Sequence, residues 1–150
     1  MAASPFALPR SPWKSGALIL AAASYVIVGV THFTNEEFFL SIVPPYLPAP
    51  LLLVWISGVF EILGGLGLLY RPTRLFASRG LVALLVAVYP ANIHMALNAG
   101  EFAAEGYEPW TLYARLPFQL VFIAWALWVG RPDPDLDPDP DLDPESEPKA

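Results

Sequence analysis

Six polar side chains stand out because they interrupt long apolar stretches of the sequence. They comprise two imidazoles, one carboxylate, one guanidinium and two amides, at His32, Glu61, Asn92, His94, Arg115 and Gln119. Imidazole and carboxylate groups can exchange protons, whereas guanidinium and amide groups donate hydrogen bonds to oxygen atoms of a ligand. Together these residue types predict a polar cavity that binds a small molecule.

Glu61 is the most unusual of the six, because it lies within twenty almost unbroken apolar residues, 51–70. A lone carboxylate near the middle of a membrane costs about 2.5 kcal/mol or more. It must therefore face the protein interior, find a partner or be protonated. We expect Glu61 to pair with Arg115, directly or through a water, and His94 is the alternative partner. A purely structural contact between helices is the other interpretation of Glu61.

The remaining polar residues also have structural alternatives. Arg115 could be an interfacial anchor, and His32 could sit at the membrane interface without binding anything. His94 follows Pro90 by four residues and could bond a carbonyl that the proline frees. No metal site is expected, because the two histidines and Glu61 lie in three different stretches without local ligand spacing. The chain has no cysteine, which excludes disulfides and thiol chemistry.

These residues sit in four apolar stretches, 16–33, 51–70, 75–97 and 112–129. A bilayer core about 30 Å thick requires roughly 20 helical residues to cross it. Only 15% of the chain is charged, against roughly 25% in soluble domains. The first stretch stays apolar beyond its small residues, so it indicates a retained helix instead of a cleaved signal. The sequence predicts an all-α, integral membrane, up-down four-helix transmembrane bundle.

Basic residues orient the predicted bundle, because positive residues stay in the cytoplasm. They flank one end of every span, at Arg10, Lys14, Arg71, Arg74, Arg79 and Arg131. The loops 34–50 and 98–111 contain no lysine or arginine. Both termini should thus be cytoplasmic in a bacterial plasma membrane, with the proline-rich loop 34–50 along the outer surface. The six polar residues then lie in the outer half, which predicts an outward-opening cavity lined by all four helices.

The charge distribution divides the chain into three parts: an N-terminal segment 1–15, a transmembrane domain 16–131 and a tail 132–150. The tail holds eight acids and one base, whereas residues 1–131 hold six acids and seven bases. Prolines alternate with the acids, and few apolar residues are present to offset the entropy of ordering. We expect a disordered, solubilising cytoplasmic terminus; the alternative is a docking motif.

Several short motifs resemble those of a known family. In order they are "GVTHF", "IVPPYLPAP", "SGVFEILGGLGLL", "RPTRLFA", "YPANIHMA" and "ARLPFQ". Over residues 16–130 they resemble the DoxX-like family of small four-helix bacterial membrane proteins. Some relatives look like membrane subunits of thiosulfate:quinone oxidoreductase, others associate with redox partners, and similar animal proteins assist receptor assembly. The resemblance implies a polar cavity at the six residues, and the absence of cysteine argues against dithiol chemistry here.

Three functions follow as hypotheses. The first is a redox-associated accessory subunit that binds a quinone-like or small amphipathic ligand. The second is a non-catalytic membrane interaction or assembly protein whose polar cluster is structural. The third is a small proton-coupled carrier, which would need a homodimer through Gly64, Gly65 and Gly67. The bilayer and a membrane or redox protein are the expected partners, with no nucleic acid and no stand-alone enzyme activity.

Overall fold

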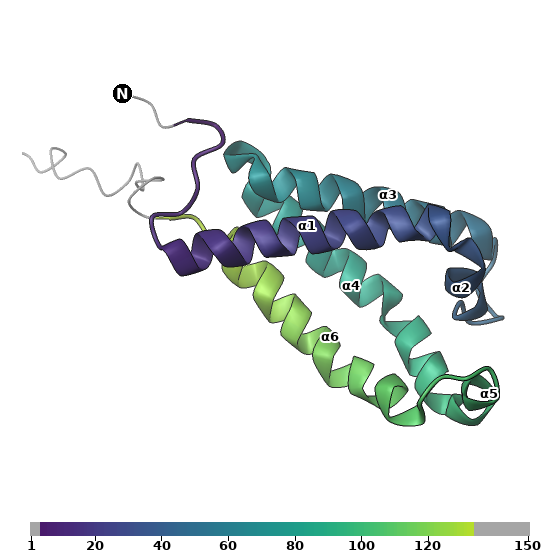
Figure 1. Cartoon of the computed structure of the whole chain (residues 1–150). Coiled ribbons are helices and arrows are strands. Elements are labelled where there is room, and N and C mark those ends of the chain that lie inside the picture. Colours follow the sequence, from purple (N-terminus) through teal and green to yellow (C-terminus); the bar gives the residue numbers. More distant parts are fainter. Residues whose placement is uncertain (1–3, 134–150) are drawn as a thin grey trace, which may run out of the picture.

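The computed structural model describes residues 4–133, and every regular element in this range is a helix (Figure 1). The long helices are α1 (Pro12–Thr34), α3 (Pro50–Leu69), α4 (Arg74–Leu97) and α6 (Pro109–Gly130). The short ones are α2 (Glu36–Ser41), η1 (Arg71–Thr73) and α5 (Ala99–Ala104). Four helices of the described chain are long and apolar enough to cross a membrane, which confirms the four predicted spans. The predicted disorder of the tail concerns residues that, apart from 132 and 133, lie outside the described range.

Proline shapes both the starts and the interiors of the long helices. Pro12, Pro50 and Pro109 stand in the first turns of α1, α3 and α6. At such positions the missing N–H would have had no partner within the helix. Pro90 and Pro117 lie inside α4 and α6. Each of them removes a backbone hydrogen bond and tends to bend its helix.

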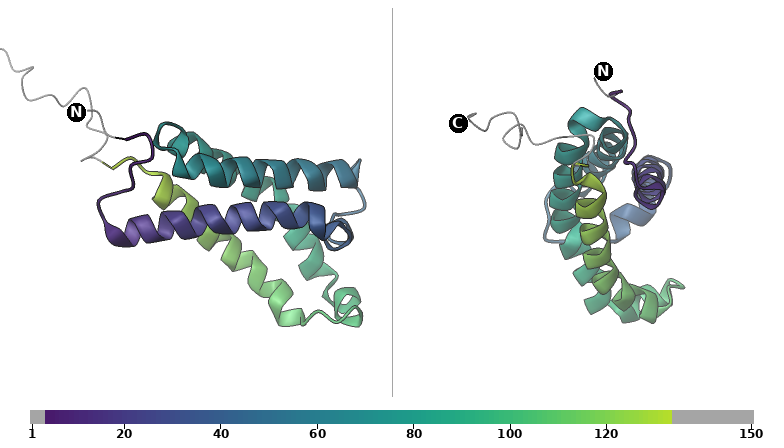
Figure 2. Two further views of the ribbon diagram at one scale, coloured as in Figure 1. Left: turned by 45° about the horizontal axis from the view of Figure 1, so that its top comes forward. Right: turned by 90° about the vertical axis from the view of Figure 1, so that its left-hand side faces the viewer.

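The four long helices pack as two pairs, α1 with α3 and α4 with α6, and contacts between α3 and α4 join the pairs. Contacts between α1 and α6 are few. The pairs meet at the end where α1 begins and α6 ends, and they diverge toward α2 and α5 (Figures 1 and 2). The helices thus alternate in direction as predicted, but the half near α2 and α5 is two separate pairs.

The buried apolar residues form two clusters that match this arrangement. The first draws on all four long helices and comprises Leu18, Ala21, Ala22, Leu68, Leu81 and Val129. The second draws on α4, α5 and α6 and comprises Met95, Ala99, Phe102 and Leu112. The end that carries the basic residues is therefore the place where the pairs are held together.

Glycines allow α1 and α3 to approach closely. A Cβ atom on Gly58 would lie 2.7 Å from the Cβ of His32 and 2.8 Å from the carbonyl oxygen of Gly29. A Cβ on Gly65 would lie 2.7 Å from the carbonyl oxygen of Ala22. Contacts this short leave no room for any side chain, so the helices pack backbone to backbone.

The other glycines of α3 face α4. A Cβ on Gly64 would meet Leu81, and one on Gly67 would meet Ala77. The three glycines that we expected to support a homodimer, Gly64, Gly65 and Gly67, thus serve packing within the chain.

Candidate functional site

One polar contact between the long helices joins an imidazole of α1 to a carboxylate of α3. The Nδ1 atom of His32 lies 3.3 Å from Oε2 of Glu61. Both side chains are largely buried, with exposed fractions of 8% for His32 and 14% for Glu61. Burial strengthens the electrostatic interaction of the two groups, because no water screens it.

The glycine contacts explain why these two residues meet. His32 lies three residues after Gly29, and Glu61 lies three residues after Gly58, on helices that run in opposite directions. Because Gly58 lies against the Cβ of His32, the three residues from Gly58 to Glu61, at 1.5 Å each, offset the Cα atoms of His32 and Glu61 along the helix axes by about 4.5 Å. Side chains tilt toward the N-terminus of their own helix, so in this antiparallel pair they converge and close the offset.

The His32 ring has a second partner, which decides how it interacts with Glu61. Its Nδ1 atom lies 3.0 Å from the carbonyl oxygen of Val28. A carbonyl only accepts hydrogen bonds, so Nδ1 must carry the proton and donate it there. The same proton therefore points away from Glu61, and the buried Oε2 atom accepts no hydrogen bond from any described residue. Glu61 thus lies beside the imidazole without accepting its proton, and its Oε2 atom remains an unused acceptor.

Two aromatic residues that the sequence analysis did not select surround the pair. The Phe39 ring, from α2, stacks on His32 with the ring centroids 3.7 Å apart. Tyr25, two turns before His32 on the same helix, packs against the first apolar cluster. The seven-residue spacing of Tyr25 and His32 places both on one helix face, a signal that was available in the sequence. Nothing in the sequence indicated Phe39, because a loop separates α2 from α3.

The expected partners of Glu61 are wrong for the described chain. Its ion pair there is with His32 and not with Arg115 or His94. Arg115 belongs to α6, which packs on α4, whereas Glu61 lies on the face of α3 that packs on α1. Arg115 is half-buried and makes no hydrogen bond or ion pair with any described residue. The pairing of helices, which the sequence analysis left open, determines this result.

Asn92 and Gln119 form a second polar contact, between α4 and α6. The Asn92 side-chain amide donates to Oε1 of Gln119 over 2.6 Å. Gln119 is 4% exposed, and its Nε2 atom donates to the carbonyl of Leu85. That residue directly precedes Val86, whose carbonyl would have paired with the N–H that Pro90 lacks. Gln119, and not His94, therefore supplies a side-chain donor to the bent part of α4.

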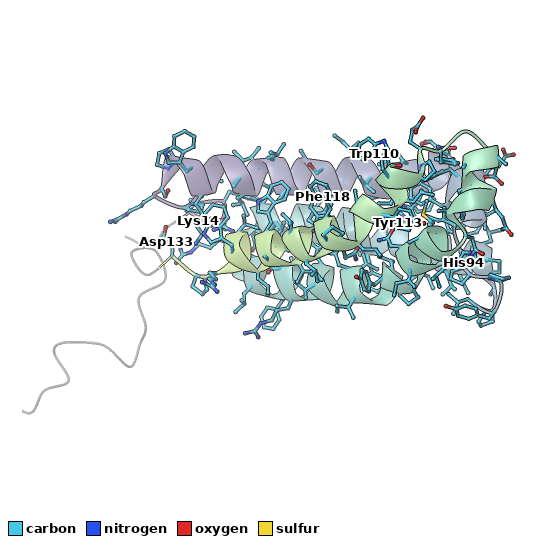
Figure 3. The ribbon with its side chains drawn as sticks, turned by 90° about the horizontal axis from the view of Figure 1, so that it is seen from below. Lys14, His94, Trp110, Tyr113, Phe118 and Asp133 are labelled. Carbon is cyan, nitrogen blue, oxygen red and sulfur yellow. The ribbon has the colours of Figure 1, made fainter. Side chains whose placement is uncertain are left out.

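His94 belongs to a third, local contact at the end of α4. The Asn98 side-chain amide lies 2.9 Å from Nδ1 of His94 and also donates to the His94 carbonyl. Figure 3 shows His94 at the opposite end of the molecule from Lys14 and Asp133. The six predicted residues thus fall into three separate groups, with Arg115 alone.

The pockets of the described chain lie elsewhere. One of about 470 Å³ lies between Pro5, Arg71, Arg74 and Pro132. Another, of about 280 Å³, lies beside Ala49, Leu51 and Trp55. None of the six residues lines either pocket. The printed polar contacts of His32, Glu61, Asn92 and Gln119 lie within helix pairs, and a cavity lined by all four helices stays a prediction.

A metal site finds no support in the part of the chain that the structure describes. No group of three or more histidine, cysteine, aspartate or glutamate side chains there is arranged to hold a metal ion. The His32–Glu61 pair alone provides two such groups. Imidazole and carboxyl groups are both of types that can take up and release protons.

Comparison with known proteins places the chain in a family without assigned function. Residues 20–130 match the family described as Domain of unknown function (DUF8561). The chain belongs to this family. The match covers all four long helices except the first turns of α1, and with them every residue of the three polar groups. Neither the curated proteins nor the solved structures yielded a match.

Proposed function

We propose that this chain is a multi-pass membrane protein of DoxX-like architecture that serves as a redox-associated accessory subunit. In this proposal a quinone-like or other small amphipathic molecule binds beside the His32–Glu61 pair. The observation that carries it is the buried Oε2 atom of Glu61, which accepts no hydrogen bond from the described chain. A hydroxyl group of a reduced quinone could donate to this oxygen.

The surroundings of the pair support an aromatic ligand over an ion. Phe39 already stacks on His32, and flat rings pack well against such stacks. Glu61 and His32 could also exchange the protons that quinone reduction requires. Entry would have to occur from the lipid or from the side where the helix pairs diverge (Figure 2).

Copurification tests this proposal. The full chain is purified in a mild detergent, extracted and analysed for quinones by absorbance and mass spectrometry. We expect a bound quinone in the native chain and in His94→Gln, whose ring bonds only within α4. We expect at least a tenfold loss in Glu61→Gln, equivalent to about 1.4 kcal/mol. A folded native chain that retains no quinone and binds no added short-chain quinone contradicts the proposal.

A second function is favoured by the α4–α6 contacts. Asn92, Gln119 and the Leu85 carbonyl are linked to one another, as are His94 and Asn98. Polar groups linked in this way fix helix packing without a ligand, as in a non-catalytic interaction or assembly protein. In that case no quinone binds, and Glu61→Gln changes only stability.

The proposed orientation places both termini in the cytoplasm of a bacterial plasma membrane. Its support is the basic residues at one end of the helices, because cytoplasmic loops collect lysine and arginine. Alkaline phosphatase fused after residue 40 or 104 should be active outside the cytoplasm, and after residue 135 it should be inactive. Phosphatase activity from the fusion at 135 would reverse this topology.

A further inference from the structure

A row of aromatic rings connects the two helix pairs at the end where they diverge. The Phe39 ring stacks on His32, and the centroid of the Phe38 ring lies 5.1 Å from that of Phe39. The Phe38 ring in turn lies 6.0 Å, between centroids, from the ring of Tyr107 in the loop between α5 and α6. Tyr107 packs against the second apolar cluster. The contact of Phe38 with Tyr107 therefore joins α2, beside the α1–α3 pair, to the α4–α6 pair.

The residue that ends α2 makes a second connection of this kind. Ile42 caps α2 and packs against the second apolar cluster, whose residues belong to α4, α5 and α6. We call this contact and the contact of Phe38 with Tyr107 the latch. No residue of α2 itself is buried, so the helix lies on the surface of the protein (Figure 1). Surface elements with few buried contacts open locally at a lower free-energy cost than the core.

The start of α2 is attached to the first pair instead. The Nε1 atom of Trp55, on α3, donates to Oε2 of Glu36 over 2.8 Å. Asn35, between α1 and α2, has a backbone φ of −133° and ψ of 50°, which interrupts the helix there. The segment is thus attached to α3 at its first residue, covers the His32 ring with Phe39 and contacts the other pair at its end.

We propose that residues 36–42 form a lid over the His32–Glu61 pair, which the latch of Phe38 and Ile42 holds closed. When the latch opens, the lid turns about its first residue and uncovers the imidazole. A molecule that enters where the helix pairs diverge then reaches the free oxygen of the carboxylate. The identity of that molecule rests on the proposed function, whereas the lid is a property of the chain alone.

Chemical modification of histidine tests the lid, because the chain contains only two histidines, His32 and His94. The full chain is treated briefly with diethyl pyrocarbonate, which reacts with accessible imidazole rings, and mass spectrometry of peptides gives the rate at each histidine. Phe39→Ala removes the ring that covers His32 and supplies the reference rate. Phe38→Ala and Tyr107→Ala each remove one side of the latch. Circular dichroism confirms that the variants are folded.

We expect His32 to react at least about threefold faster in Phe38→Ala and in Tyr107→Ala, because loss of an aromatic pair shifts an equilibrium by about two- to tenfold and the reaction follows the open population. His94, whose ring contacts Asn98 and Phe102, should keep its native rate in Phe38→Ala.

Tyr113→Ala is the matched control for Tyr107→Ala. Tyr113 lies near the same end, is 55% exposed and makes no ring contact with any described residue, so its removal should leave the His32 rate unchanged. The same ratios should appear in a Glu61→Gln background, which holds no quinone under the proposed function. The lid and the ligand are thus tested separately.

Three results would overturn the lid. One is an unchanged His32 rate in Phe38→Ala and Tyr107→Ala while Phe39→Ala raises it, because α2 is then not held by the latch. Another is an equal rise at both histidines, which shows a general loosening of the fold. The third is an unchanged His32 rate in Phe39→Ala, because that ring then covers nothing. A chain that binds quinone but gives any of these results keeps the proposed function and loses the lid.

Discussion

The two helix pairs bury polar groups in different ways. Between α1 and α3 the contact is a carboxylate beside an imidazole. It lies next to the glycines at which the two helix backbones touch. Between α4 and α6 the contacts are neutral: Asn92 with Gln119, and Ser78, whose hydroxyl donates to the Ala126 carbonyl over 2.7 Å. The first pair keeps an unused acceptor on Glu61, whereas the amides of the second pair bond to each other and to the backbone.

This difference distinguishes a candidate binding site, between α1 and α3, from contacts that only hold helices together, between α4 and α6. Neutral amides and hydroxyls in membrane helices are commonly used to fix packing, with contributions that average about 0.6 kcal/mol. An ionisable residue at membrane depth costs more and is usually functional. The comparison therefore supports the α1–α3 pair as the place of the proposed site, and the α4–α6 contacts as fixing how those two helices pack. Four substitutions test that assignment, from the largest expected effect to the smallest.

His32→Ala should destabilise the fold most. It leaves Glu61 buried without its charge partner, and removing one member of a buried pair typically costs about 3–5 kcal/mol. The free energy of unfolding, measured by denaturing-detergent titration, should fall by this amount. His94→Ala is the matched control, because the His94 side chain bonds only to Asn98, directly after its own helix; it should cost under about 1 kcal/mol. Equal losses in the two variants would show that the His32–Glu61 contact stabilises the fold no more than the local contact of His94 does.

Gly58→Ala should cause the second-largest loss of stability, because its Cβ would lie 2.7 Å from the Cβ of His32. Overpacking of this kind costs about 1–3 kcal/mol. Gly80 also lies in a long helix but has open space around it. Gly80→Ala should be neutral or stabilise by up to about 1 kcal/mol, as the helix propensity of alanine predicts. Thermal unfolding in detergent separates the two, and an unaltered melting temperature in Gly58→Ala would be incompatible with the close helix contact.

Gln119→Leu should have a smaller effect, about 1 kcal/mol, because it removes hydrogen bonds to Asn92 and to the Leu85 carbonyl within the membrane. The same titration measures it. Quinone retention should be unchanged in this variant. Loss of ligand with intact stability would move the candidate site to the α4–α6 pair.

Arg115→Gln should change stability least, by under about 0.5 kcal/mol. The reason is that Arg115 is only half-buried and bonds to no other described residue. A loss above about 2 kcal/mol in the same titration would indicate a buried partner, which is the pairing that the sequence analysis expected and the structure does not contain.

The sequence predicted the helices well and their pairing poorly. Apolar runs of about twenty residues bounded by prolines and charges define the spans, and the short "RPTR" turn correctly makes α3 and α4 neighbours. Lipid-facing and protein-facing surfaces are both apolar, so hydrophobicity does not say which helix packs against α3. The usable signal was the seven-residue spacing of Ala22 and Gly29 on α1 and of Gly58 and Gly65 on α3. That spacing would have brought His32, and not Arg115, to Glu61.

The burial of Arg74 was also beyond the sequence. Its position between the second and third spans suggested only a cytoplasmic flank, but its hydrogen bonds run to Leu68 and to Ala7, which is 67 residues away in the sequence. Contacts of this kind depend on how the chain ends fold back on the helices. Local charge patterns do not predict how the chain ends fold back.

A double-mutant cycle on His32 and Glu61 tests the central claim most directly, with Arg115 and Glu61 as the parallel cycle. The variants His32→Gln, Arg115→Gln and Glu61→Gln, and the two double variants, are unfolded under the same conditions. We predict a coupling free energy of about 1–3 kcal/mol between His32 and Glu61, and additivity within about 0.5 kcal/mol for Arg115 and Glu61. Additive effects of His32 and Glu61, with coupling of Arg115 to Glu61 instead, would contradict the account.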